Sequence, residues 1–180
     1  MPFIDTHIAD LKIFEPNVWE DERGYFYESY NAQTFQTAGI EAKFVQDNQA
    51  LSSFGVLRGL HYQTGEAAQS KLVRVIEGEV LDVAVDIRPE SATYGKSCSV
   101  LLSGENKRQF FVPRGFAHGY VVLSQKAIFF YKCDNFYNPA KEGGIRFDDP
   151  TLDIDWKIEL NVAQLSEKDR ILPFFGEHRT

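Results

Sequence analysis

The sequence is poor in the residues that build disulfide frameworks and structural metal sites. It contains two cysteines, Cys98 and Cys133, which lie far apart and form no C-x-x-C pair. It also lacks an apolar run of membrane-spanning length, and its first residues include the charged side chains of Asp5, Asp10 and Lys12, unlike a signal peptide. We therefore expect a soluble protein that works in a reducing cytoplasm.

Positive charge is also scarce. The chain carries 19 lysines and arginines against 26 acidic residues, which gives a net charge of -7 and a pI near 5.1. Such a balance disfavours binding to nucleic acid or to an anionic membrane, so any phosphate must be held by a local basic cluster. Repeats, low-complexity tracts and Ser/Gly-rich linkers are absent, and we predict one domain over residues 1–180.

What the sequence does contain is a series of short strand-like segments between turn residues. The clearest is the segment 80–87, in which Leu81, Val83 and Val85 share one face and Asp82 and Asp86 the other, as in a strand with one buried face. Similar segments are 24–30, 44–46, 57–63, 71–77, 97–102, 108–112, 118–123 and 128–132. Helix signals are confined to residues near 31–38 and to a C-terminal segment that begins at Ser166. The pattern predicts an all-β sandwich or barrel with short peripheral helices.

Four histidines are available for chemistry. We expect His7 in the first strand or its approach and His178 in a frayed tail, which leaves His61 and His118. Both follow an arginine and a glycine by a few positions. A histidine-rich metal cluster would need a second histidine two residues after His61, where the chain has Gln63, so metal binding is disfavoured.

Metal-free acid/base catalysis is the second hypothesis for His61. Asp169 could hold its imidazole, although Asp169 serves equally well as the closing acid of a capping box opened by Ser166. Tyr131 is either a proton-donating phenol or an ordinary strand aromatic. Lys71 is either an ammonium that faces developing negative charge or a solvated lysine at a strand start, and the local pattern favours the solvated lysine.

Polar groups suited to ligand recognition occur in three other places. Arg23 lies in a charged turn, and Gln46, Asp47 and Asn48 are consecutive. Arginines and amides suit phosphate, sugar hydroxyls or a base. Tyr137 lies in a turn where its ring could stack on a base or simply pin the loop.

Taken in order, these motifs resemble one family. They are Asp21-x-Arg23-Gly24, Gln46-Asp47-Asn48, Arg58-Gly59-Leu60-His61-Tyr62-Gln63, Lys71-Leu72-Val73-Arg74, Asp82-Val83-Ala84-Val85-Asp86-Ile87-Arg88, Pro113-Arg114-Gly115-Phe116-Ala117-His118-Gly119, Tyr131-Lys132 and Ser166-Glu167-Lys168-Asp169. The chain resembles the dTDP-4-dehydrorhamnose 3,5-epimerase family over nearly its whole length. The resemblance implies a cupin-like jelly-roll β-sandwich, usually a homodimer, that acts in dTDP-L-rhamnose synthesis without a metal or other cofactor.

The resemblance also implies roles for individual residues. His61 would be the base that removes protons beside the C4 ketone, with Asp169 as its partner, Tyr131 as the acid and Lys71 near the enolate oxygen. Tyr137 would stack on thymine. The remaining substrate-binding positions would be Arg23, Glu28, Gln46, Asp47, Asn48, Arg58, His118, Glu142 and Lys168.

Other functions remain open at this point. Relatives on the same scaffold invert one centre only or act as ketoisomerases, and Tyr131 favours the double epimerase over these. A non-catalytic nucleotide-sugar-binding module would keep Arg23, Gln46 and Tyr137 but would not need His61 and Asp169 together. The segment Gln49-Ala50-Leu51 is less polar than is usual in the family, which we interpret as loop variation.

Overall fold

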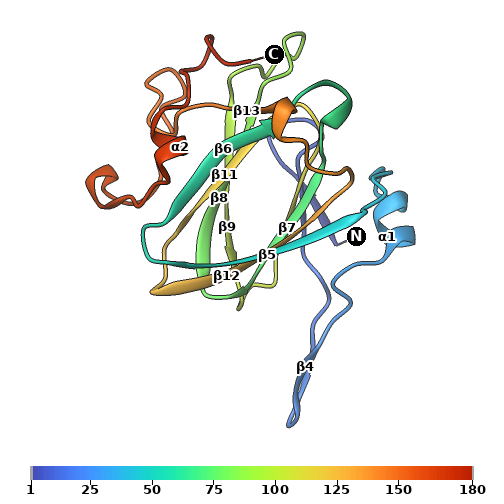
Figure 1. Cartoon of the computed structure of the whole chain (residues 1–180). Coiled ribbons are helices and arrows are strands. Elements are labelled where there is room, and N and C mark those ends of the chain that lie inside the picture. The colour runs from blue at the N-terminus through green and yellow to red at the C-terminus, as the bar shows by residue number, and fades with distance from the viewer. Residues whose placement is uncertain (1, 180) are drawn as a thin grey trace.

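The computed structural model of the protein describes residues 2–179, and its main body is a sandwich of two antiparallel sheets (Figure 1). The larger sheet has the order β1 (Phe3–Asp5), β2 (Lys12–Phe14), β10 (Gln109–Val112), β7 (Lys71–Glu77), β12 (Lys126–Cys133), β5 (Gln46–Ser53). The smaller has the order β13 (Glu142–Gly144), β6 (Leu57–Gln63), β11 (Phe116–Val122), β8 (Glu79–Asp86), β9 (Ser97–Ser103). The predicted all-β, cupin-like jelly roll is confirmed.

Helices are short and peripheral, as predicted. They are α1 (Ala32–Thr37), α2 (Glu167–Arg170) and the 3-10 turns Gly65–Ala67, Pro139–Lys141 and Leu160–Val162. Asn31 caps α1, because its side chain accepts hydrogen bonds from the backbone of Gln33 and Thr34. Within residues 2–179, none of these helices has the length and apolar character needed to span a membrane.

A hairpin of β3 (Trp19–Asp21) and β4 (Gly24–Phe26) forms a third, separate sheet that extends away from the sandwich (Figure 1). Its aromatic side chains are exposed, with Phe26 70% and Trp19 59% accessible. A strand over all of residues 24–30 was therefore a wrong prediction, since the ladder ends at Phe26.

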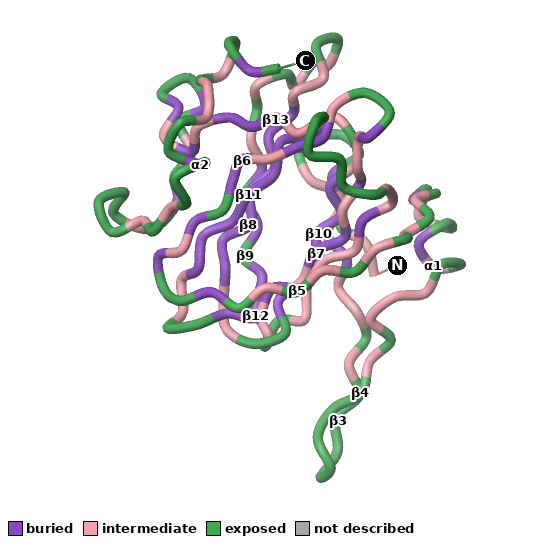
Figure 2. Tube along the Cα trace, viewed as in Figure 1, coloured by how far each residue is buried: buried purple, intermediate pink, exposed green. Residues whose placement is uncertain are grey.

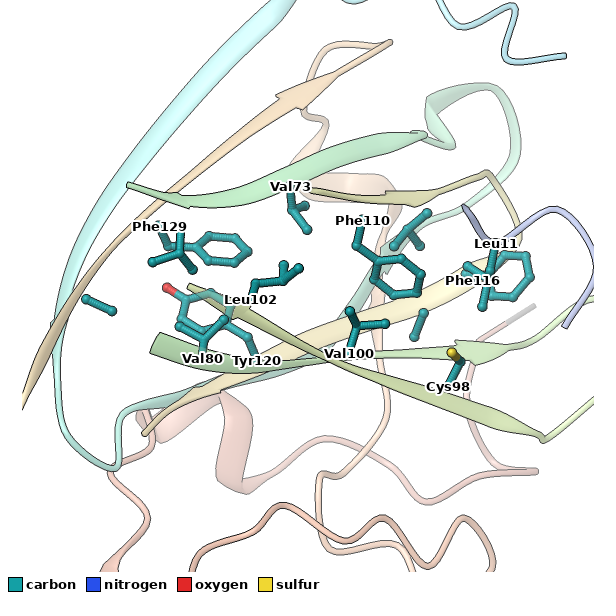
Figure 3. Packing of buried hydrophobic residues seen from close by; sticks show 14 of the residues in the cluster. Leu11, Val73, Val80, Cys98, Val100, Leu102, Phe110, Phe116, Tyr120 and Phe129 are labelled. Carbon is teal, nitrogen blue, oxygen red and sulfur yellow. The ribbon is translucent and has the colours of Figure 1, made fainter. Parts of the chain in front are cut away.

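Strand β8 is buried on both faces, whereas its sequence predicts one exposed face. Val80 and Ala84 belong to the core between the two sheets, with Val73 and Phe129 from the larger sheet (Figure 3). On the other face, the C-terminal half of the chain covers the strand; the residues of this outer cluster include Leu81, Val83, Val85, Ile145, Phe147, Leu152 and Trp156. Figure 2 shows the resulting continuous buried band in the smaller sheet. The polar residues of β8, Asp82 and Asp86, are consequently buried rather than solvated.

The C-terminal tail is packed onto the body instead of frayed, which corrects the expectation for His178. Its imidazole is buried, stacks on Phe175, and accepts a hydrogen bond at Nδ1 from the backbone of Gly176. Tyr62 donates its hydroxyl hydrogen to the carbonyl oxygen of Arg179. These contacts place His178 in the covering layer, outside the cavity described below, and His7 lies in a bend after β1 with its ring bonded to the Ser97 carbonyl.

Candidate active site

A cavity of about 520 Å³ lies between the two sheets at the end next to α2. Strands β6 and β11 contribute His61 and His118, which face each other in register, and β7 and β12 contribute Lys71 and Tyr131. A second hollow of about 280 Å³ shares His61, Lys71 and Tyr131 with the first and is lined also by Gln46, Asn48, Tyr137 and Glu142. The two hollows adjoin at these three shared side chains, and we treat them as one candidate site.

His61 and Asp169 form a hydrogen-bonded pair across 108 positions of sequence. The Nε2 atom of His61 lies 2.5 Å from Oδ1 of Asp169, a carboxylate that is 3% exposed. Ser166 caps α2 and accepts a hydrogen bond from the backbone N–H of Asp169, while the Asp169 side chain is left to reach β6 beside it (Figure 1). Of the two roles that its local sequence left open, the Asp169 side chain takes the one of imidazole partner, and only its backbone N–H takes part in the Ser166 cap.

The protonation of Asp169 follows from its surroundings. Burial pushes its pKa upward, but the hydrogen bond and charge of His61 and the Ser166 cap outweigh burial and hold the pKa below its usual range. An ionised carboxylate only accepts hydrogen bonds. The hydrogen in this contact is therefore on Nε2 of His61, which leaves Nδ1 as the nitrogen able to take a proton.

Tyr131 and Lys71 lie together on the opposite sheet. Burial raises the pKa of Tyr131 to about 12, so its phenol carries a proton at neutral pH. Burial lowers the pKa of Lys71, and the nearby Cys133, Asp82 and Glu142 counteract this effect. The Lys71 ammonium lies 6.0 Å from the centre of the Tyr131 ring. Lys71 therefore lines the cavity, whereas its local sequence favoured a solvated lysine.

The residues expected to bind substrate divide into two groups, and the first lines the site. Arg58 is held by hydrogen bonds of 3.3 and 3.4 Å to Oγ of Ser52. Gln46 donates to the Asn48 side chain over 3.0 Å. These amides begin β5, an eight-residue edge strand where the sequence had predicted a strand over 44–46 only.

Glu142 joins two further expected residues at the rim. Its Oε2 accepts a hydrogen bond of 2.7 Å from the hydroxyl of Tyr137 and lies 2.5 Å from Nζ of Lys168. Burial raises the pKa of Glu142, and the contacts with Lys168 and Tyr137 reverse this and lower the pKa overall. An ionised glutamate thus ties the ring of Tyr137 to the residue that precedes Asp169.

The second group lies outside the cavity lining. Asp47 alternates to the other face of β5, where it pairs with Lys132 at 2.9 Å. Arg23 is in the turn of the β3–β4 hairpin, 85% exposed and paired with Asp21. Glu28 accepts a hydrogen bond from Asn31, ahead of α1. The single chain does not bring these three residues to the site.

One close contact of the cavity was missed by the sequence analysis. Nε2 of His118 lies 2.8 Å from Oδ1 of Asp82, a residue that the alternating pattern had assigned to an exposed face. Among residues 2–179, no group of three or more His, Cys, Asp or Glu side chains is arranged to hold a metal ion. The site therefore offers imidazoles, a phenol, cationic groups and paired carboxylates.

Comparisons with known proteins agree on one family. The family model for dTDP-4-dehydrorhamnose 3,5-epimerase matches residues 5–177. The chain is 52% identical over 178 residues to dTDP-4-dehydrorhamnose 3,5-epimerase of Salmonella typhimurium, which covers 98% of this chain and 97% of the relative.

Solved structures are equally similar. The crystal structure of dTDP-4-dehydrorhamnose 3,5-epimerase from Elizabethkingia anophelis superposes with a TM-score of 0.94 at 56% identity, covering 97% of this chain and 96% of the other. A 3,5-epimerase from Legionella pneumophila, in complex with dTDP-4-keto-L-rhamnose, gives a TM-score of 0.94 at 52% identity, with 97% and 93% covered. This chain accordingly belongs to the dTDP-4-dehydrorhamnose 3,5-epimerase family.

Proposed function

We propose that the protein inverts C3 and C5 of dTDP-4-dehydro-6-deoxy-D-glucose and so provides dTDP-4-dehydro-L-rhamnose for dTDP-L-rhamnose synthesis. The observation that carries this proposal is the pairing of His61 with Asp169 in the same cavity as Tyr131. A module that only bound nucleotide sugars would not need a base held by a buried carboxylate opposite a protonated phenol.

The C4 ketone acidifies the hydrogens on both neighbouring carbons, because the carbanion left behind is delocalised onto the ketone oxygen. Nδ1 of His61 takes each proton in turn, while Asp169 holds the ring by its Nε2–H and stabilises the imidazolium. Lys71 lines the same cavity, and its ammonium stabilises the enolate oxygen in this proposal.

Inversion requires that a proton return to the opposite face of the carbon. Tyr131 comes from the sheet that faces His61, and its high pKa keeps the phenol protonated until a strongly basic enolate carbon forms. The same pair serves both centres when the ring turns to present C3 and C5 in succession, once the proton on His61 has passed to solvent and solvent has returned a proton to Tyr131. The reaction is a proton exchange, so its balance needs no cofactor.

The nucleotide lies in the second hollow in this proposal. Gln46 and Asn48 offer amides to the base or sugar, Tyr137 offers its ring for stacking on thymine, and Arg58, Lys168 and His118 line the path toward the diphosphate and the hexose. Asp47 acts from the outer face of β5, where its pair with Lys132 fixes the strand.

Arg23 and Glu28 serve this function only in a homodimer, whose second copy would insert its β3–β4 hairpin at the rim of the site. The hairpin carries exposed aromatics, Trp19, Tyr25 and Phe26, and an isolated two-stranded ribbon gains little stability alone. Arg23 at its turn supplies the cation that a diphosphate requires.

The test is incubation of the purified protein with dTDP-4-keto-6-deoxy-D-glucose in heavy water, with deuterium at C3 and C5 followed by mass spectrometry and NMR. We expect incorporation and inversion at both carbons. Incorporation at one carbon would instead assign a mono-epimerase or ketoisomerase. Tight binding without incorporation would assign a nucleotide-sugar-binding module.

A further inference from the structure

The cavity contains a second imidazole–carboxylate pair beside the first. His118 on β11 lies directly opposite His61 on β6, and its Nε2 is 2.8 Å from Oδ1 of Asp82 on β8. His118 is 7% exposed and Asp82 is fully buried. The reaction described above uses Asp169 and leaves Asp82 without a role.

Asp82 occupies a buried position at which an apolar residue would give a more stable folded protein. Val80 and Ala84, its neighbours on the same face of β8, belong to the core between the sheets. An ionised carboxylate moved into such surroundings loses its hydration and needs a partner. Within the described part of the chain, His118 is the only side chain that hydrogen-bonds to Asp82, and Oδ2 of Asp82 has no partner.

This contact determines how His118 meets a ligand. Because a carboxylate accepts and does not donate, the hydrogen in the contact is on Nε2 of His118, and Nδ1 is left unengaged by the described residues. The ring is held on its flat side by Phe129, at 6.4 Å between centroids and an angle of 28°. Because both contacts fix the His118 ring, only its Nδ1 is available to a ligand, and in one orientation.

The charge of Asp82 also reaches Lys71. Burial lowers the pKa of the Lys71 ammonium, and Asp82 is one of three neighbours that oppose this shift. The Asp82 carboxylate thus supports both the orientation of His118 and the positive charge of Lys71.

We propose that Asp82 is a positioning residue of the active site, which fixes the tautomer and the orientation of His118 so that its Nδ1 contacts the keto sugar. The identity of the ligand rests on the proposed function, whereas the tautomer does not. The arrangement makes the two histidines a matched pair, each held at Nε2 by a buried carboxylate from a different element.

The first test reads the tautomer in the unmodified protein. Long-range proton–nitrogen NMR on protein labelled with nitrogen-15 distinguishes the Nε2–H from the Nδ1–H form of each histidine. We expect His118 to carry its hydrogen on Nε2. A His118 in the Nδ1–H form, or one that exchanges freely between tautomers, overturns the proposal whether or not the protein is an epimerase.

The second test is a double-mutant cycle on kcat/KM with Asp82→Asn and His118→Gln. Asp82→Asn keeps the shape but lets an amide donate to Nε2, and we expect a loss on the order of 10- to 100-fold, as for other residues that orient a functional imidazole. If Asp82 acts mainly through His118, Asp82→Asn costs much less in the His118→Gln background than in the unmodified protein, and a small remaining loss reports its effect on Lys71. Losses that multiply in the double variant overturn the proposal.

Asp86→Asn is the matched control. Asp86 lies on the same strand, is equally buried, and bonds to Arg88 outside the cavity. We expect normal turnover per folded molecule from this variant. If Asp82→Asn does not fold, the tautomer measurement decides alone; if the unmodified protein exchanges no deuterium, the proposed function fails while the tautomer result stands.

Discussion

The close approach of β6 and β11 offers a direct test of how backbone packing supports the site. Gly119 lies between His118 and Tyr120, where the register of the two strands shifts. A Cβ atom on Gly119 would lie 2.7 Å from the carbonyl oxygen of Arg58 and 2.9 Å from Cα of Gly59, whereas ordinary contact begins at 3.4 Å. Gly119→Ala therefore forces the strands apart by about 0.7 Å.

The effect of this displacement can be estimated for both the stability and the activity of the protein. Overpacking of a well-packed core costs about 1–3 kcal/mol, and we expect the free energy of unfolding to fall by that amount. His118 is the residue next to Gly119, and a misplacement of about 1 Å near the chemistry costs on the order of 100-fold in rate. We expect kcat/KM to fall by roughly 10- to 100-fold. Urea denaturation and the deuterium-exchange assay measure the two effects.

Gly104→Ala separates the local effect from general destabilisation. A Cβ atom there would lie 2.6 Å from the carbonyl oxygen of Ile76 and 3.2 Å from Cα of Glu77, so the crowding is similar, but Gly104 is outside the lining of the cavity. We expect lower stability and unchanged turnover. Gly119→Ala protein that is as stable and as active as the unmodified enzyme would refute the reasoning.

Four further outcomes are expected. His61→Ala should fold but lose nearly all turnover in the exchange assay; substantial turnover would contradict its role as base. Tyr131→Phe should impair protonation at one centre more than exchange at the other, and equal effects on both would contradict its role as acid. Arg23→Ala should raise KM with little change in kcat, measured by steady-state kinetics, and unchanged kinetics would argue against the inserted hairpin. Burial raises the pKa of Asp86, but hydrogen bonds from Arg88, Ser91 and Thr93 outweigh burial and lower the pKa overall. Asp86→Asn should therefore cost about 1.5–3 kcal/mol at neutral pH, measured by urea denaturation, and the difference from the unmodified protein should shrink as pH falls below about 4.

The strands that could be predicted from sequence are those whose residues alternate or form compact apolar runs. The expected segments 57–63 and 71–77 coincide with β6 and β7, and the expected helix near 31–38 is α1. Strand β5 was mostly missed, because its cavity side carries amides and its other side is exposed, as at Leu51. A strand that lines a polar cavity at a sheet edge lacks the apolar alternation on which such predictions depend.

The pairing of the catalytic candidates could not be derived from local sequence. An acidic residue three positions after the N-cap Ser166 is already accounted for by helix capping at the start of α2. Nothing nearby in the sequence indicates that the Asp169 carboxylate bonds to a distant residue instead. In the structure the Ser166 cap uses only the backbone N–H of Asp169, so the Asp169 carboxylate is available to bond to His61. The resemblance to a family supplied the link that spacing did not.

The acidic residues of β8 show that segments later in the chain can bury a strand face that the local sequence predicts to be exposed. Alternation over residues 80–87 predicts one exposed face only if nothing covers that strand. The apolar residues Ile145, Phe147 and Trp156 cover one face, and the opposite sheet covers the other. An aspartate in such a strand must then find a partner, and Asp82 finds His118 in the cavity. Asp86, equally buried on the same strand, bonds to Arg88 outside the cavity, so it is the imidazole partner of Asp82, and not burial alone, that connects a carboxylate of this strand to the site.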